Sequence, residues 1–224
     1  MNLAGMIDQT CLKPYGDGTE VVKLCREAKK HVFASVCVHP CEVSRAAKLL
    51  KGTKVAVCTV IGFPLGQNTP AVKLCEALDA LANGATELDF VVNVFKLKAA
   101  VAKGANSREA KRLTSAWSQI VSSVKAARPS VVTKLIIECC YLTRGEKVFA
   151  AKMCRKAGFD YVKTSTGFGS GGATVEDVKL LRKAVGPQTG VKAAGGIRTK
   201  ADALAMIAAG ATRLGCSVGV AIVL

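Results

Sequence analysis

The chain has 224 residues, half of them hydrophobic and 21% charged, and its formal net charge is +16. This length and hydrophobic content predict a single domain over residues 1–224 with a substantial core, and they exclude a disordered chain. No apolar run approaches the roughly 20 residues that cross a bilayer, and the N-terminus lacks the basic start of a leader peptide. We therefore expect a cytoplasmic protein that does not enter a membrane.

The ten cysteines lie within apolar runs, where a free cysteine behaves as a small hydrophobic residue. Cys37 and Cys41 flank His39 in a spacing that zinc could use, but the only other histidine is His31, so no second pair completes a set of four ligands. Catalytic zinc and iron sites usually draw on several imidazoles. The sequence therefore predicts no metal site.

The excess of basic residues would steer anionic substrates and would equally attract nucleic acid. The lysines and arginines are spread along helical segments such as Val22–Lys30, as on ordinary solvated faces, and aromatic residues make up only 5% of the chain. Proteins that bind single-stranded nucleic acid rely on aromatic stacking as well as on charge. We therefore expect a small anionic substrate rather than nucleic acid.

Short apolar segments alternate with amphipathic segments along the chain. The apolar segments predict strands at Met6–Asp8, Ala34–Val38, Val55–Ile61, Glu87–Val92, Lys134–Glu138, Tyr161–Lys163, Gly190–Ala193 and Thr212–Cys216. The amphipathic segments predict helices at Glu20–Lys30, Cys41–Lys51, Pro70–Ala82, Arg108–Ala127, Arg144–Ala157, Val175–Val185 and Lys200–Ala209.

Eight short strands separated by helices predict the α/β class and a closed (β/α)8, or TIM, barrel. An open doubly wound sheet is the main alternative. It would normally carry a G-x-G-x-x-G turn after the first strand, and the sequence has none there. In a barrel, the active site lies where the strands end and the following loops begin.

Two of the predicted strands carry one lysine each, Lys163 and Lys192, and each leads into a glycine turn and a helix start. Burial lowers the pKa of a lysine, and two ammonium groups about 6 Å apart repel by on the order of 3 kcal/mol, or about two pKa units. A neutral amine attacks carbonyl carbon to form an imine. A single such lysine would more often reach into solvent, but the matched pair predicts Schiff-base chemistry on a phosphorylated carbonyl compound.

Asp89 lies inside the apolar run Leu88–Val92. Strand alternation places Leu88, Phe90 and Val92 on one face and Asp89 on the other. Because the large apolar side chains should face the helices, we expect Asp89 inside the barrel, where a nearby lysine would neutralise it.

Glycine turns follow the sixth, seventh and eighth predicted strands. Free N–H groups at such turns suit a phosphate, as barrels often show near their last two strands. The predicted phosphate-binding residues are Gly167, Phe168, Gly195, Gly196, Ile197, Arg198, Gly215 and Ser217.

Several segments carry a family resemblance. Val162–Gly169 (Val-Lys-Thr-Ser-Thr-Gly-Phe-Gly) and Val191–Thr199 (Val-Lys-Ala-Ala-Gly-Gly-Ile-Arg-Thr) resemble the signature segments of the deoxyribose-phosphate aldolases. Further blocks resemble that family in the same order, at Ile7–Thr10, Ser35–Val38, Cys58–Gly66 and Glu87–Asp89, so that the resemblance runs from about Ile7 to Val223.

The resemblance implies a barrel aldolase that uses neither an organic cofactor nor a metal and cleaves a deoxy sugar phosphate in nucleotide catabolism. By position in the family motifs, Lys163 is implied as the Schiff-base residue, Lys192 as its activating partner and Asp89 as a proton shuttle. We also expect a homo-oligomer, a dimer or a tetramer. Asp8 and Thr10 should open the first loop and, with Cys37 and Thr166, contact the substrate.

The chain departs from the family pattern at two places. Val218 follows Ser217 where relatives commonly have a second serine, and His39 stands where many have asparagine or tyrosine. Asn93 and Glu138 are weaker candidates at the mouth and are not included in the predicted site. The remaining alternatives are another imine-forming barrel aldolase, a phosphate-binding isomerase or synthase, and a non-catalytic basic barrel that binds phosphate or nucleic acid.

Overall fold

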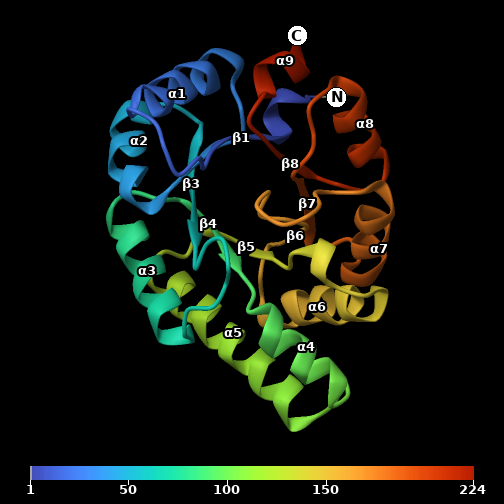
Figure 1. Cartoon of the computed structure of the whole chain (residues 1–224). Helices are drawn as coiled ribbons and strands as arrows, with labels where there is room; N and C mark the ends of the chain where they lie inside the picture. The colour runs from blue at the N-terminus through green and yellow to red at the C-terminus, as the bar shows by residue number, and fades with distance from the viewer. Residues whose placement is uncertain (1) are drawn as a thin grey trace.

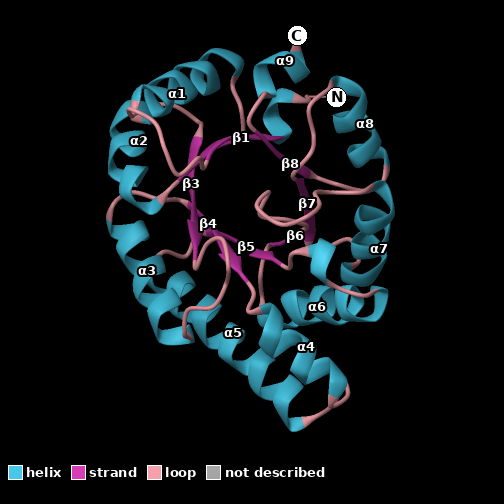
Figure 2. Ribbon diagram, in the orientation of Figure 1, coloured by secondary structure: helices cyan, strands magenta, loops and turns pink. Residues whose placement is uncertain are grey.

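The computed structural model describes residues 2–224 and forms a closed barrel in which the strands are parallel and follow one another in chain order. Figure 1 shows the helices arranged around the barrel, and Figure 2 shows the strands as an inner ring. The strands are β1 (Ile7–Cys11), β2 (Ser35–Val38), β3 (Ala56–Ile61), β4 (Glu87–Val91), β5 (Val132–Ile136), β6 (Tyr161–Lys163), β7 (Gly190–Ala194) and β8 (Arg213–Cys216). The predicted TIM barrel is confirmed, and the open-sheet alternative is wrong because β1 pairs with β8.

The α-helices of the described chain are α1 (Thr19–His31), α2 (Val43–Leu50), α3 (Pro70–Ala82), α4 (Val94–Ala102), α5 (Arg108–Ala127), α6 (Arg144–Ala157), α7 (Val175–Val185), α8 (Lys200–Ala208) and α9 (Gly219–Val223). Short 3-10 turns lie at Ala4–Met6, Pro40–Glu42 and Cys139–Tyr141. Within residues 2–224 we find no helix that combines the length and the apolar character needed to cross a membrane.

Side-chain caps explain why the later helices begin where they do. Thr143 and Thr199 each form a capping box with the acid three residues on, and Thr174 accepts a hydrogen bond from the Asp177 amide. Helix α6 ends at Gly158, whose φ of 88° is in the left-handed region that glycine adopts without a steric penalty. Thr174 and Thr199 thus fix the ends of the loops that follow β6 and β7.

Two kinds of packing separate the outside of the barrel from the inside. Outward side chains of the strands, including Leu88 and Phe90, join the helices in one large apolar core. Inward positions of the same strands carry charged residues such as Asp89 and Lys192, which are fully buried. The alternation predicted for β4 is therefore confirmed, and the barrel interior is polar where most barrels pack branched aliphatic side chains.

Several predicted boundaries need correction. Strand β1 extends to Cys11, so that Asp8 and Thr10 lie within a strand rather than in a loop. Strand β5 ends at Ile136, and Glu138 follows it with a φ of 55°. Helix α2 begins at Val43, because Pro40–Glu42 form a 3-10 turn first. Helices α4 and α9 were not predicted; both are short and mostly apolar, so their segments lack the polar face that marks a surface helix.

Candidate active site

Asp89 lies at the centre of a buried group of charges inside the barrel. Its Oδ2 atom lies 2.8 Å from Nζ of Lys163 and 2.7 Å from Nζ of Lys192, and its Oδ1 atom lies 2.9 Å from Nζ of Lys134. Burial alone would raise the pKa of Asp89, but the ammonium groups of Lys134, Lys163 and Lys192 hold it well below its usual range. Asp89 is therefore an anion at neutral pH.

Lys163 and Lys192 are register partners on β6 and β7, and both side chains reach the same oxygen of Asp89. Lys163 is the last residue of its strand and is only 3% exposed. It thus points into the barrel near the mouth, where a substrate entering from the loops would meet it. The structure brings together the three residues that the sequence predicted as catalytic.

Lys192 differs from the expectation that burial and crowding lower the pKa of a strand lysine. Burial does act to lower the pKa of Lys192, but the carboxylates of Asp8 and Asp89 outweigh it and raise the pKa above the ordinary value. The Asp8 Oδ2 atom lies 2.5 Å from the Lys192 nitrogen. The expectation is therefore wrong for Lys192, because the attraction of two carboxylates outweighs burial and the repulsion between neighbouring amines. Lys192 stays an ammonium ion.

Asp8 is fully buried in β1, and its carboxylate is already engaged within the barrel. Its Oδ1 atom accepts hydrogen bonds from Ser35 Oγ at 2.7 Å and from Arg213 Nε at 2.5 Å. Burial would raise its pKa, but Lys192 and Arg213 lower it below the ordinary value. The prediction that Asp8 lies at the start of a loop is wrong, because Asp8 lies within β1. Asp8 instead positions Lys192.

Three charged residues that the sequence analysis missed complete this group. Lys134 Nζ lies 2.6 Å from Glu87, and Glu87 accepts from Arg213 at 2.7 Å and 2.8 Å. Lys134 carried the signal that marked Lys163 and Lys192, a lysine inside an apolar strand. Unlike those two lysines, Lys134 lies on a strand that no glycine turn follows.

The remaining predicted substrate contacts lie at the same end of the barrel. The Thr10 hydroxyl donates to the Asp8 carbonyl at 2.9 Å, and Cys37 is fully buried beside Cys58. Thr166 is nearly buried; its amide lies 3.2 Å from Oε1 of Glu138, and its hydroxyl donates to the same carboxylate. Glu138, which the sequence prediction left out, thus holds the start of the glycine turn after β6.

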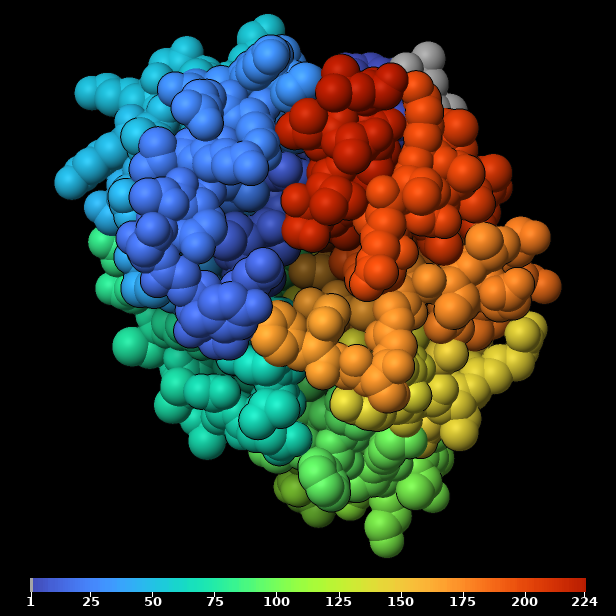
Figure 3. All heavy atoms as spheres, turned by 45° about the horizontal axis from the view of Figure 1, so that its top comes forward, coloured from blue at the N-terminus to red at the C-terminus, as the bar shows by residue number. Residues whose placement is uncertain are grey.

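The predicted phosphate loops lie side by side. Gly167, Gly195 and Gly196 have φ values of 88°, 87° and 81°, and the Ala173 amide donates to the Gly195 carbonyl at 3.0 Å. Phe168, Arg198 and Ser217 are exposed. Figure 3 shows the loop after β6 (orange) beside the N-terminal segment (blue) and the C-terminal segment (red).

Ile197 does not fit the side-chain part of the phosphate prediction. Its side chain is 4% exposed and packs in the apolar core, so only its backbone amide can face an anion. The residues at the loops that offer side-chain donors are Arg198 and Ser217, which follow β7 and β8.

An apolar cavity of about 790 Å³ opens next to Thr166. Leu65, Phe95 and Phe168 line it together with Glu138 and Thr166. The cavity gives the mouth of the barrel one apolar side, while the glycine turns give it a polar side. A molecule with a phosphate at one end and an uncharged carbon chain at the other fits this division.

Comparison with known proteins agrees with the geometry. The chain matches the DeoC/LacD family of aldolases over residues 3–224. It is 53% identical over 223 residues to a deoxyribose-phosphate aldolase of Thermoanaerobacter sp. (strain X514), covering 100% of this chain and 96% of the relative. The same enzyme of Geobacillus sp. (strain WCH70) is 54% identical over 222 residues, covering 99% and 95% of the two chains.

A solved structure is similar over almost the whole length. The tetrameric deoxyribose phosphate aldolase of Aeropyrum pernix superposes with a TM-score of 0.86 at 35% identity, covering 98% of this chain and 88% of that one. Both the sequence and the barrel therefore match members of one family. The chain belongs to the DeoC/LacD family of aldolases.

Proposed function

We propose that this protein is a class I aldolase that reversibly cleaves 2-deoxy-D-ribose 5-phosphate to D-glyceraldehyde 3-phosphate and acetaldehyde, with Lys163 as the Schiff-base residue. Relatives at 53% identity over the full chain carry this activity in their names. The observation that carries the assignment of residues is the contact of Lys163 and Lys192 with one oxygen of the buried Asp89.

Lys163 begins the reaction by adding its nitrogen to C1 of the open-chain sugar. It must lose a proton first, and Asp89 Oδ2 is an acceptor 2.8 Å away. Because Asp89 has a lowered pKa, it passes the proton on rather than keeping it. The carbinolamine then loses water and becomes an iminium ion, which withdraws electrons from the sugar.

Carbon–carbon cleavage follows from that iminium. The C3 hydroxyl loses its proton toward Asp89 through water, the C2–C3 electrons move into the iminium, and D-glyceraldehyde 3-phosphate leaves. The remaining enamine takes a proton at C2 from Lys192, whose raised pKa keeps it charged between turnovers. The proton that Asp89 received from the C3 hydroxyl then passes to Lys192, 2.7 Å away, and restores both groups. Water then hydrolyses the imine, releases acetaldehyde and restores the amine.

The phosphate group would bind at the glycine turns after β6, β7 and β8. Exposed Arg198 and Ser217 supply side-chain donors, and the turns supply backbone N–H groups. Replacing Arg198 by alanine should raise KM for the sugar phosphate about tenfold to a hundredfold, since a hydrogen bond to a charged group contributes about 1.5–3 kcal/mol. KM for unphosphorylated deoxyribose should hardly change. Equal effects on both sugars would contradict this phosphate site.

Trapping of the intermediate tests the catalytic residue. Incubation with acetaldehyde and borohydride should leave a reduced two-carbon adduct on Lys163, identified by peptide mass spectrometry. The variant Lys163→Ala should lose both the adduct and turnover, while Lys125→Ala, which changes a half-exposed surface lysine, should keep both. An adduct on another lysine, or none in the wild type, would overturn the assignment.

We further propose that the chain acts without a metal or organic cofactor, that it forms one domain in the cytoplasm, and that it assembles as a dimer or tetramer. The similarity to a tetrameric enzyme supports an oligomer. Turnover that persists in EDTA and a mass above the monomer by light scattering would support the proposal. A monomer by light scattering would contradict the assembly.

A further inference from the structure

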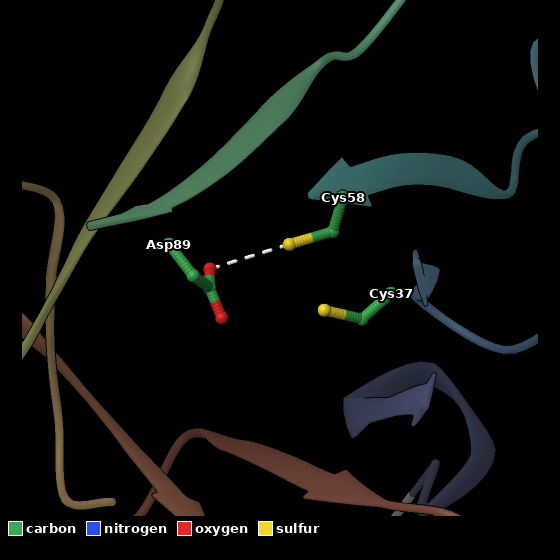
Figure 4. Close-up of side chains that lie close together, drawn as sticks. All are labelled: Cys37, Cys58 and Asp89. Atoms are coloured by element: carbon green, nitrogen blue, oxygen red, sulfur yellow. Dashed lines mark hydrogen bonds between the residues drawn. The ribbon is translucent and has the colours of Figure 1, made fainter. Parts of the chain in front are cut away.

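Two cysteines lie face to face in the barrel beside Asp89. Cys37 on β2 and Cys58 on β3 are register partners, and both are fully buried. Their sulfur atoms and a carboxylate oxygen of Asp89 all lie within 4.8 Å of one another. Figure 4 shows both sulfur atoms pointing from their strands toward Asp89.

The backbone geometry at this pair suits a disulfide. Partners on neighbouring strands have Cα atoms about 4.8 Å apart, inside the 4.4–6.8 Å range that disulfides span. Because Cys37 and Cys58 occupy matching inward positions, both Cβ atoms lie on the same face of the sheet. The sulfur atoms need only rotate about their side-chain torsions to meet.

The surroundings lower the pKa of the Cys37 thiol and disfavour a bound cation. The neighbouring Cys58 side chain lowers the pKa of the Cys37 thiol, although burial opposes this. Asp89, the third member of the group, already contacts three ammonium groups, so a divalent metal ion would meet strong repulsion there. Oxidation therefore fits this pair better than metal binding does.

We propose that Cys37 and Cys58 form a redox-sensitive pair, in which a peroxide converts the thiols to a disulfide and switches the aldolase off reversibly. The disulfide itself does not depend on the proposed function, whereas the loss of turnover rests on it. A peroxide is small enough to follow the route that the aldehyde takes to Lys163. Lys163 is 3% exposed, and it forms a hydrogen bond with Asp89, the residue beside both cysteines.

The chemistry balances with hydrogen peroxide as the oxidant. The Cys37 thiolate attacks one peroxide oxygen, the O–O bond breaks, and the departing hydroxide is protonated to water, leaving a sulfenic acid. The Cys58 sulfur then attacks the Cys37 sulfur, the S–O bond breaks, and the oxygen leaves as a second water with the Cys58 proton. Two thiols are oxidised and one peroxide is reduced to two waters.

Oxidation acts on the site through Cys58. Its sulfur lies 3.2 Å from Asp89 Oδ1, as a hydrogen-bond donor, and 3.5 Å from Lys134 Nζ. A disulfide has no thiol hydrogen, so Asp89 loses that donor, and the two strands behind it become covalently joined. We expect kcat to fall about tenfold or more, because displacing a positioned group by about an ångström carries a cost of that order or larger.

The test combines mass spectrometry with turnover. Protein treated with hydrogen peroxide and digested without reductant should yield a peptide pair linked through Cys37 and Cys58, and activity should fall and then return with dithiothreitol. The double variant Cys41→Ser/Cys75→Ser, which changes two exposed cysteines, should respond as the wild type does. In Cys58→Ala, the sulfenic acid at Cys37 has no partner thiol, so peroxide should oxidise it further to the sulfinic acid. Dithiothreitol does not reduce a sulfinic acid and should then fail to restore the lost turnover.

Sulfinic acid at Cys37 without any linked peptide in the wild type would overturn the proposal. So would a linked peptide with unchanged turnover, since the disulfide would then form without switching the enzyme. Untreated protein that shows no turnover at all would count against the aldolase assignment alone, and the linked peptide would still decide whether this pair is oxidised.

Discussion

Lys134 shows how a single buried ammonium group holds the interior of this barrel together. It is fully buried and contacts both Glu87 and Asp89, at 2.6 Å and 2.9 Å. Replacing it by methionine removes the cation and leaves two carboxylates close to each other. We expect Lys134→Met to lower the free energy of unfolding by about 3–5 kcal/mol, the cost of breaking a buried ion pair from one side.

Urea denaturation of the two proteins measures that difference, with Lys23→Met as the matched control. Lys23 pairs with Glu27 at 3.9 Å across an exposed helix surface, where such a pair is worth about 0.5 kcal/mol or less. Similar losses of unfolding free energy in the two variants would show that the buried ion pairs of Lys134 stabilise the fold no more than an exposed pair does.

Asp8 gives the barrel a dependence on acid. Its pKa is lowered by Lys192 and Arg213 from an ordinary value of 3.8, so the folded state holds fewer protons than the unfolded state as the pH falls. The stability that Asp8 contributes is therefore complete above about pH 5 and is lost progressively below it. We expect the unfolding free energy of the wild type to fall more steeply between about pH 5 and pH 3 than that of Asp8→Asn. Parallel curves would contradict this.

At the scale of residues, the sequence could place Asp89 because alternation in β4 is unambiguous: Leu88 and Phe90 need the apolar side. It could not place Asp8 beside Lys192, because these residues lie far apart in sequence, on β1 and β7, and their side chains meet only inside the closed barrel. The charge state of each lysine depends on such contacts. For the same reason Glu87, Lys134 and Arg213 were missed.

At the scale of elements, Lys73 ties the loop after β3 to the barrel. The side chain projects from α3, and its Nζ donates to the carbonyls of Gly66 at 2.7 Å and Val91 at 2.8 Å. Burial lowers the pKa of Lys73 from 10.5 to about 8, although Glu76 acts to raise it. One helix residue thus fixes a loop at the mouth and the end of β4 together.

This lowered pKa predicts a dependence on alkaline pH. Between about 8 and 10.5 the folded state releases the Lys73 proton while the unfolded state keeps it, so the unfolding free energy gains a contribution that rises with pH. In Lys73→Met that contribution is absent, and the difference between wild type and variant should change in this window in favour of the wild type. Denaturation at pH 7.5 and at pH 10 measures it; a difference independent of pH would contradict the prediction.

Helices with clear start signals were predicted to the residue. Thr69 with Pro70 begins α3, Ser107 caps α5, and Thr143 caps α6. Helix α4 has a cap as well, Asn93, but it follows β4 with no polar residue before it, and its Val-Phe and Ala-Ala-Val stretches continue the apolar pattern of the strand. The end of β4 is fixed by its pairing with β5, which stops at Val91 and is not visible in the sequence pattern.

At the scale of the whole molecule, the net charge of +16 should act on the capture of an anionic substrate. Added salt shortens the range of the field, to about 10 Å at 0.1 M. We expect kcat/KM for deoxyribose 5-phosphate to fall several-fold between about 20 mM and 500 mM salt, and that for unphosphorylated deoxyribose to change little. An equal salt response of both sugars would show that the field does not act on the phosphate.

Trp117 is the single tryptophan of the chain, and it lies 4% exposed in the aromatic core behind β4. Its ring meets Phe90 and Phe159 edge-on, at centroid distances of 6.1 Å and 5.6 Å, and Lys73 Nζ lies 5.1 Å from its centre. Phe90 directly follows Asp89. The protein therefore carries an intrinsic fluorophore whose emission reports on the packing behind Asp89, so unfolding and titration can be followed optically without attaching any dye.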